Sequence, residues 1–207
     1  MLYFKNIRWK NFLSTGNQFT EIQLDKTSTT LIVGENGSGK STVLDALCFG
    51  LFSKPFRRIN RPQLINSIND GGLLVEIEFE VGSRSYMVRR GIKKNIFEIF
   101  IDGKRLNQDA KTADQQEYLE KTILKLNYKS FTQIVLLGAN HYIPFMQLKS
   151  TDRRTIIEDL LDIQIFSVMN TLLKYKISEN KEDNQNIEGN RKLSVAHISN
   201  TEEAINE

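Results

Sequence analysis

Three glycines within six residues, followed at once by a lysine and a serine, constrain this 207-residue chain more than any other feature of its sequence. Residues 34–41 read GENGSGKS and match the pattern G-x-x-x-x-G-K-S/T without exception. The short apolar run 31–33 precedes this stretch, and apolar residues at helical spacing follow it. The pattern predicts a strand over 31–33, a tight glycine turn, and a helix that begins at about Lys40.

A strand, a glycine turn and a helix N-terminus together are typical of a phosphate-binding loop. Gly34, Gly37 and Gly39 permit positive φ, so that backbone N–H groups can turn inward around an anion. The helix N-terminus adds its partial positive charge. In this motif the lysine, here Lys40, binds the β- and γ-phosphates, and the next hydroxyl, that of Ser41, binds Mg²⁺. We therefore expect a bound nucleoside triphosphate; the alternative is a glycine turn that carries these residues by chance.

The remaining pattern predicts an α/β fold. From Leu74 to Leu106 apolar residues alternate with polar ones, and Asp102-Gly103 predicts a type I′ hairpin turn. This segment should therefore be an antiparallel β-meander with one solvated face, which carries Glu76 and its neighbouring glutamates. Helices are expected over residues 112–126 and from about Ser150 onward, where serine, threonine or aspartate can cap the first turn.

Composition excludes several classes of protein. The single cysteine, Cys48, excludes a disulfide framework and a multi-cysteine metal site, and its place among apolar residues predicts a core position. No stretch approaches the about 18 consecutive apolar residues of a membrane span. The N-terminus has no signal-peptide pattern. We expect a soluble cytoplasmic protein with no membrane partner.

Charge divides the chain unevenly. Residues 1–178 contain 25 Lys and Arg against 18 Asp and Glu, whereas residues 179–207 contain 3 against 7. A basic body suggests a polyanionic partner. The acidic tail is polar and carries Gly189, so we expect residues 179–207 to be weakly helical or disordered.

Several parts of a hydrolytic ATPase are missing from these residues. We find no Walker B strand, which would be an apolar run ending in Asp and followed by a catalytic Glu, and no LSGG-type signature. Asp102 ends an apolar run, but the hairpin turn explains it better. The stretch Asn180-Lys181-Glu182-Asp183 matches a guanine-binding motif, but its polar surroundings favour a solvated charge run. Three hypotheses remain: an ATPase half-site, a non-catalytic nucleotide-binding module, and a small P-loop kinase, which the absence of an arginine-rich lid disfavours.

Together, the early phosphate-binding loop, the meander, the late helix and the missing Walker B strand resemble the N-terminal half of the head of the SMC-like, ABC-type coiled-coil ATPases. Within that group the chain is similar to the DNA double-strand-break-repair ATPases typified by bacterial SbcC, and above all to their T-even-phage members. The resemblance rests on KNFLSTG (10–16), LIVGENGSGKSTVLDALCFGLFSKPFR (31–57), QLINS (63–67), YMVRRGIKKNIFEI (86–99), FTQIVLLG (131–138), PFMQL (144–148) and DRRTIIEDLLDI (152–163).

The resemblance implies the fold, the ligands and the partners. It implies a P-loop NTPase lobe with an antiparallel meander, ending in a helix that starts a coiled coil. The cofactors would be ATP and Mg²⁺, and the partners would be the C-terminal half of the same ATPase, a second head in an ATP-dependent homodimer, an SbcD-type nuclease and double-stranded DNA without sequence preference. The nucleotide-binding residues would be Gly34, Asn36, Gly37, Ser38, Gly39, Lys40, Ser41 and Thr42.

The sequence departs from the family at one point. The family usually has a glutamine after the apolar run that corresponds to 134–137, and this glutamine contacts Mg²⁺ and the attacking water. Here Gly138-Ala139-Asn140-His141 follows instead. Asn140 or His141 could replace it as a metal ligand, and Gln133 and Gln147 lie nearby in sequence. The resemblance also implies that residues 10–14 lie near the base and ribose.

Two basic clusters are candidates for contact with DNA phosphates. The candidate residues are Lys54, Arg57, Arg58 and Arg61 in one cluster, and Arg89, Arg90, Lys93 and Lys94, near Arg84, in the other. The alternative is that these cations protect solvated strand edges.

The predicted organisation is a lobe over 1–150, a helix at the coiled-coil base over 151–178, and the tail. The helix carries an apolar stripe at three- and four-residue steps: Leu161, Ile165, Val168, Leu172 and Tyr175. The stripe could pack on its own domain; the family resemblance favours contact with the nuclease.

Overall fold

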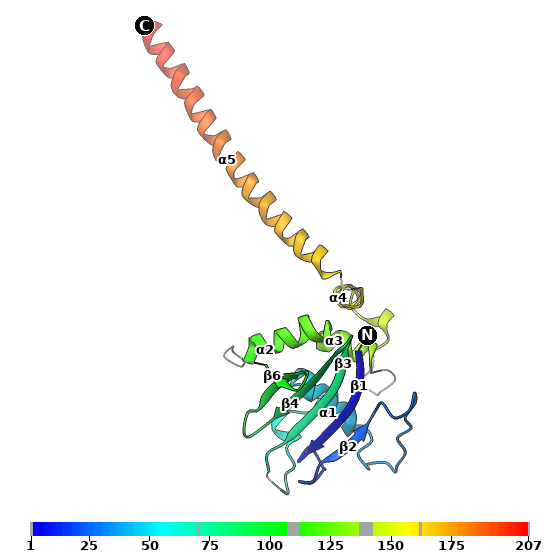
Figure 1. Ribbon diagram of the computed structural model, residues 1–207. Helices are drawn as coiled ribbons and strands as arrows, with labels where there is room; N and C mark the ends of the chain where they lie inside the picture. Colours follow the sequence, from blue (N-terminus) through cyan, green and yellow to red (C-terminus); the bar gives the residue numbers. More distant parts are fainter. Residues whose placement is uncertain (1, 70, 107–111, 137–142, 162, 207) are drawn as a thin grey trace. The chain divides into compact units, whose positions relative to one another are not determined.

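A computed structural model describes residues 2–69, 71–106, 112–136, 143–161 and 163–206 (Figure 1). The chain forms two compact units, residues 1–160 and residues 161–207. The first unit combines a sheet with short helices, so the predicted α/β class is confirmed. The division at residue 160 falls within the segment that the sequence assigns to the coiled-coil base.

The first unit is built on a six-stranded antiparallel sheet with the strand order β2-β1-β3-β4-β5-β6. The strands are β1 (Leu2–Lys10), β2 (Thr20–Gln23), β3 (Leu74–Val81), β4 (Arg84–Gly91), β5 (Phe97–Ile101) and β6 (Lys104–Arg105). Strands β3 to β6 pair in the order in which they follow one another, which confirms the predicted meander. Asp102 and Gly103 both have positive φ, 49° and 77°, as a type I′ turn requires.

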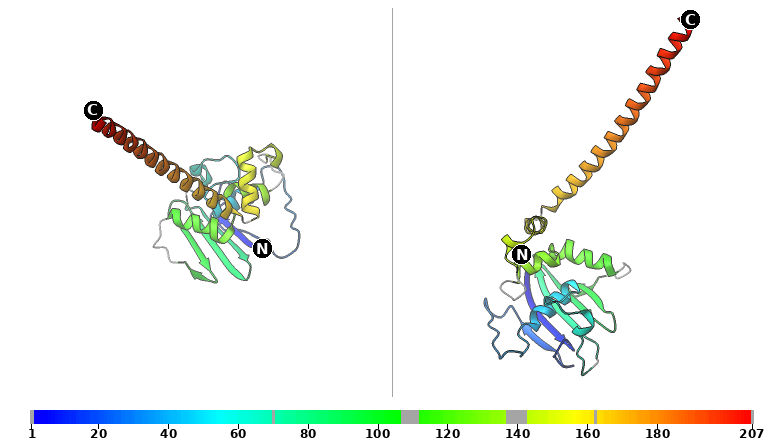
Figure 2. Two further views of the ribbon diagram at one scale, coloured as in Figure 1. Left: turned by 90° about the horizontal axis from the view of Figure 1, so that it is seen from above. Right: turned by 180° about the vertical axis from the view of Figure 1, so that it is seen from behind.

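Helix α1 (Thr42–Phe52) packs on one face of this sheet (Figure 2). Its apolar side chains join those of Ile7, Ile77 and Val88 in one buried core. Gly50 permits the close approach of helix and sheet, because a Cβ at this position would lie 2.4 Å from Cδ1 of Ile77. Cys48 is fully buried, as predicted, and burial raises the pKa of its thiol. The glycine motif is thus followed by a helix that the core holds firmly.

The other helices of this unit are short. They are η1 (Arg61–Leu64), α2 (Thr112–Tyr118), the π-helical η2 (Leu119–Leu124), α3 (Tyr128–Ile134), η3 (Phe145–Gln147) and α4 (Ser150–Leu160). Phe131 of α3 contacts Phe52 at the end of α1, with the ring centroids 5.1 Å apart. Aromatic packing therefore joins α3 to the helix that follows the glycine motif.

Polar contacts fasten α4 to the start of α3. Asn127 accepts hydrogen bonds from the backbone N–H groups of Lys129 and Ser130 and thereby caps α3. Its Nδ2 donates to Oδ2 of Asp159 in α4 at 2.6 Å, and the hydroxyl of Ser130 donates to the same oxygen. An ion pair of 2.6 Å between Lys129 and Asp152 adds a second attachment. The first part of the predicted C-terminal helix therefore belongs to the lobe.

The outer face of the sheet differs from the prediction at Glu76, which is 3% exposed where we expected a solvated side chain. Arg8 on β1 and Arg89 on β4 stand beside it in register, and each donates a hydrogen bond to one of its carboxylate oxygens. Arg89 also contacts Glu98, which in turn binds Arg105. The long arginine side chains cover Glu76, so the glutamate is buried although its face is polar.

The second unit is one helix, α5 (Gln164–Asn206), of 43 residues. The prediction of a weakly helical or disordered tail is therefore wrong for residues 179–206. The tail contains no proline, so nothing sterically interrupts the helix although its apolar pattern fades. The predicted single helix from about residue 150 is also interrupted, because α4 ends at Leu160. No described helix has both the length and the apolar character that a membrane span requires.

Candidate nucleotide-binding site

The segment before the glycine motif is not a strand, contrary to the prediction. Residues 31–35 have no regular secondary structure and stand outside the sheet. Leu31 and Val33 are 83% and 78% exposed. Strand geometry needs a neighbouring strand for its hydrogen bonds, and none of the described strands pairs with this segment. An apolar segment is therefore left on the surface directly beside the motif.

The glycine turn has the predicted positive φ at Gly37 and Gly39 but not at Gly34. Gly37 and Gly39 have φ values of 88° and 94°, a region that side-chain-bearing residues rarely adopt. Helix α1 begins at Thr42, two residues later than predicted, and Ser41 stands at its N-cap. The hydroxyl of Ser41 makes no capping hydrogen bond and the residue is exposed, so it can bind an external ligand.

Lys40 folds back over its own loop. Its Nζ donates to the carbonyl oxygens of Gly34 at 2.6 Å and Glu35 at 2.7 Å. These contacts hold the ammonium group beside the turn, where the motif requires a cation for phosphate oxygens.

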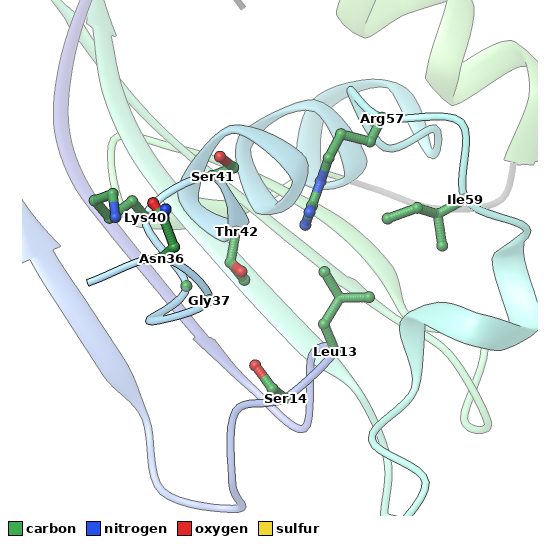
Figure 3. A pocket seen from close by; sticks show the side chains of 10 residues that line it. Leu13, Ser14, Asn36, Gly37, Lys40, Ser41, Thr42, Arg57 and Ile59 are labelled. Carbon is green, nitrogen blue, oxygen red and sulfur yellow. The ribbon is translucent and has the colours of Figure 1, made fainter. Parts of the chain in front are cut away.

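A cavity of about 390 Å³ opens beside this turn (Figure 3). Its lining residues are Leu13, Ser14, Asn36, Gly37, Gly39, Lys40, Ser41, Thr42, Arg57 and Ile59. They come from three segments: the connection after β1, the glycine motif with the start of α1, and the loop after α1. Of the predicted nucleotide-binding residues, Gly34 and Ser38 are not part of this lining, and the other six are. Leu13 and Ser14, predicted to lie near the base and ribose, line the cavity as well.

Arg57 is the residue whose place the sequence analysis missed. We grouped it with DNA-binding cations, but it lines the cavity, and Asp45 of α1 holds it there. The Arg57 backbone N–H donates to Oδ1 of Asp45 at 2.8 Å, its Nε donates to Oδ2 at 2.7 Å, and Nη2 lies 2.6 Å from Oδ2. Asp45 is fully buried. A charged residue on the otherwise apolar side of α1 was the available sequence signal.

A second cavity, of about 810 Å³, shares Leu13 and Ser14 with the first. Asn66 supports this shared edge, because its Nδ2 donates to the carbonyl oxygens of Leu13 at 3.0 Å and Thr15 at 3.1 Å. These hydrogen bonds attach the connection after β1 to Asn66 between the two cavities.

The prediction of a DNA contact at Arg90 is wrong. Arg90 is 4% exposed, and its guanidinium donates to the carbonyl oxygens of Gly50 and Leu51, in the last turn of α1, and to Gln116. Burial, with a smaller effect of the Arg61 charge, lowers the pKa of Arg90 to about 9. The last carbonyl groups of a helix have no hydrogen-bond donors within the helix, and the guanidinium of Arg90 provides donors for two of them.

The other predicted DNA residues divide into two groups. Arg89 is engaged by Glu76 and Glu98, so its charge is largely compensated. Lys54, Arg58, Arg61, Lys93 and Lys94 are exposed. Asn140 and His141, the alternative metal ligands, lie outside the described residues.

Residues 6–207 match the sequence profile of a family described as an AAA domain. The chain belongs to this AAA-domain family. A likeness to the Smc head domain of Pyrococcus furiosus, solved with an extended coiled coil and bound to the C-terminal domain of ScpA, confirms the predicted ATPase-head fold. The TM-score is 0.56 with 21% identity, over 88% of this chain and 48% of that chain.

Two curated relatives confirm the resemblance that the sequence predicts for this AAA-domain chain. It is 43% identical to exonuclease subunit 2 of Escherichia phage RB69 over 94% of its length, and 28% identical to the DNA double-strand break repair Rad50 ATPase of Thermoplasma volcanium over 97%. It spans 38% of the first relative and 23% of the second.

Proposed function

We propose that this chain is the ATP-binding, N-terminal part of the ATPase subunit of a DNA-processing nuclease complex. The observation that carries the proposal is the cavity beside residues 34–42, which two cations, Lys40 and Arg57, line together with glycines at positive φ. Cations, inward-turned amides and hydroxyl groups are the donors that a triphosphate needs. The names of the phage and Rad50 relatives support the assignment to DNA processing.

Each lining residue has a task in this proposal. The amides of the glycine turn and the ammonium group of Lys40 hold the phosphates, and the guanidinium of Arg57 approaches them from the loop after α1. The Ser41 hydroxyl is the protein ligand for Mg²⁺, which neutralises phosphate charge when bound. Leu13 and Ser14 extend the site toward the base and ribose.

The proposed site is half of an active centre. Hydrolysis needs a carboxylate that positions the attacking water, and the sequence supplies no Walker B strand for it. The exposed segment 31–33, which has the composition of a strand but no partner strand among the described residues, supports a C-terminal half that pairs with it. A second head would complete the site in an ATP-dependent dimer.

DNA and a nuclease subunit are the remaining partners. The exposed cations Arg58 and Arg61 lie in the chain just after the cavity residue Arg57, and sequence-independent binding needs no more than such phosphate contacts. The apolar stripe continues on α5, where its side chains at 165, 168, 172 and 175 are 57–66% exposed. Such a stripe can pack against a helix of a nuclease subunit or against the returning helix of an antiparallel coiled coil.

The test is Mg·ATP affinity, measured by titration calorimetry, for the chain and its Lys40→Ala variant. Loss of a charge-assisted contact to phosphate should weaken binding about 10- to 150-fold. Lys121→Ala, which removes an exposed lysine paired with Glu117, is the matched control and should bind normally. Equal ATP affinity in all three proteins would refute the site.

Phosphate release measured on the same proteins tests the half-site. The isolated chain should release phosphate no faster than buffer, and addition of the C-terminal half should restore turnover that depends on Lys40. Lys40-dependent turnover by the chain alone would instead support a complete small enzyme.

A further inference from the structure

We infer that Asp45 is a positioning residue for the nucleotide: its buried carboxylate fixes the guanidinium of Arg57 at the edge of the cavity, with Nη1 presented to the phosphates. The inference deepens the proposed function and rests on it. Asp45 itself does not line the cavity, so it would act only through Arg57.

The contacts between the two residues determine both the place and the orientation of the guanidinium. Asp45 accepts from the Arg57 backbone N–H through Oδ1 and from the side chain through Oδ2. Nε and Nη2, one edge of the planar group, are therefore engaged. Nη1 takes part in none of the hydrogen bonds or ion pairs found among the described residues, so it can donate to an external anion. A lysine could not do this in a fixed orientation, because its donors share one freely rotating nitrogen and it has no planar group with two separate edges.

The loop that carries Arg57 is held at its other side as well. The hydroxyl of Tyr128 on α3 donates to the carbonyl oxygen of Pro55 at 2.8 Å, and the backbone N–H of Ser53 donates to Phe49. These contacts fix the path of the main chain but do not reach the guanidinium. Among the described contacts, only those of Asp45 orient the charged group itself.

The two possible roles of Asp45 predict opposite changes in ATP affinity when its charge is removed. A carboxylate close to a phosphate site repels the phosphates, so removal of its charge alone should tighten the binding of an anion. If Asp45 instead serves to place Arg57, its neutralisation should weaken binding. In Asp45→Asn an amide group replaces one acceptor oxygen, and its N–H groups oppose those of the guanidinium.

The experiment measures Mg·ATP affinity by titration calorimetry for Asp45→Asn, Arg57→Ala and the double variant. Each single variant should bind about tenfold or more weakly, the effect of one charge-assisted bond. The double variant should bind no more weakly than Arg57→Ala, because Asp45 then has nothing to position. Asp159→Asn is the matched control: it neutralises a carboxylate that is also buried, 5% exposed, but lies on α4, and its ATP affinity should be unchanged.

A second substitution covers the case in which Asp45→Asn does not fold. Arg57→Lys changes a half-exposed side chain and keeps its charge, but it has no second planar edge to present to phosphate while Asp45 holds the first, so it should also lose about tenfold. Unchanged or tighter binding in Asp45→Asn or Arg57→Lys would overturn the inference, as would additive losses in the double variant. Because Lys40→Ala tests the site independently, a loss there with normal Arg57 variants would reject this inference alone.

Discussion

Substitution of Gly50 by alanine should destabilise the lobe by forcing α1 away from the sheet. The added Cβ would lie 2.4 Å from Cδ1 of Ile77 and 3.1 Å from Cγ1 of Val75, well inside contact distance. Ile77 is fully buried between Ile7 and Val88 on the neighbouring strands, and both clashing side chains are β-branched with few rotamers. Relief of the contact therefore requires Ile77 to change its rotamer within the filled core or α1 to shift.

The magnitude follows from two opposing effects. Overpacking a core costs about 1–3 kcal/mol of stability. The distance of only 2.4 Å between the added Cβ and Cδ1 of Ile77 places this substitution at the upper end of that range. Alanine regains about 1 kcal/mol of helix propensity over glycine. The net loss should be about 2 kcal/mol, measurable as a lower midpoint of urea unfolding at unchanged slope. Because α1 carries Ser41 and Thr42 at its start, ATP affinity should fall as well.

Gly189→Ala provides the control for this prediction. It makes the same substitution within α5, where nothing lies within 4 Å of the new Cβ, so helix content by circular dichroism should stay equal or rise. If Gly50→Ala is as stable as the original chain, the close packing of α1 on the sheet is refuted.

Two further predictions concern Tyr128 and the exposed basic cluster. Burial, helped by the nearby Cys48 and Asp45, raises the pKa of Tyr128 from 10.0 to about 12, so the unfolded chain loses the phenol proton first as the pH rises. The stability advantage over Tyr128→Phe should therefore be complete below about pH 10 and shrink toward pH 12, as followed by urea midpoints; a constant difference would contradict this reasoning. Charge reversal at Arg58 and Arg61 in the full-length ATPase should weaken duplex DNA binding and flatten its dependence on the logarithm of salt concentration by about 0.9 per lost phosphate contact, whereas Lys121→Glu should change neither.

Local sequence predicted the parts of the fold that local interactions determine. The alternation over 74–106 gave the meander, because a period of two is enough to define the buried face of a strand. Asp102-Gly103 gave the hairpin because few residues tolerate positive φ twice in succession. The positive φ values at Gly37 and Gly39 could be predicted for the same reason, and every residue of this motif that lines the cavity was anticipated.

The misplaced residues depend on partners that are distant in sequence. Arg57 and Asp45 meet only because the loop after α1 turns back along the helix. Arg90 lies on the same buried face of β4 as Tyr86 and Val88, so the alternation along the strand could have predicted its burial. Its hydrogen-bond partners on α1 could not be predicted in this way. The apolar segment 31–33 has the composition of a strand, yet composition does not supply the neighbouring strand that would make it one.

The ion pairs among Arg8, Glu76, Arg89 and Glu98 also limit how the sequence of this protein can change. One carboxylate, that of Glu76, serves two guanidinium groups on different strands, Arg8 and Arg89, and Arg89 is shared again with Glu98. Replacement of Glu76 would leave two opposed cations with no shared counter-charge, and replacement of either arginine would expose part of a buried anion. Sequences that diverge from this one should therefore change these four positions together, so that the ion pairs are inherited as a unit.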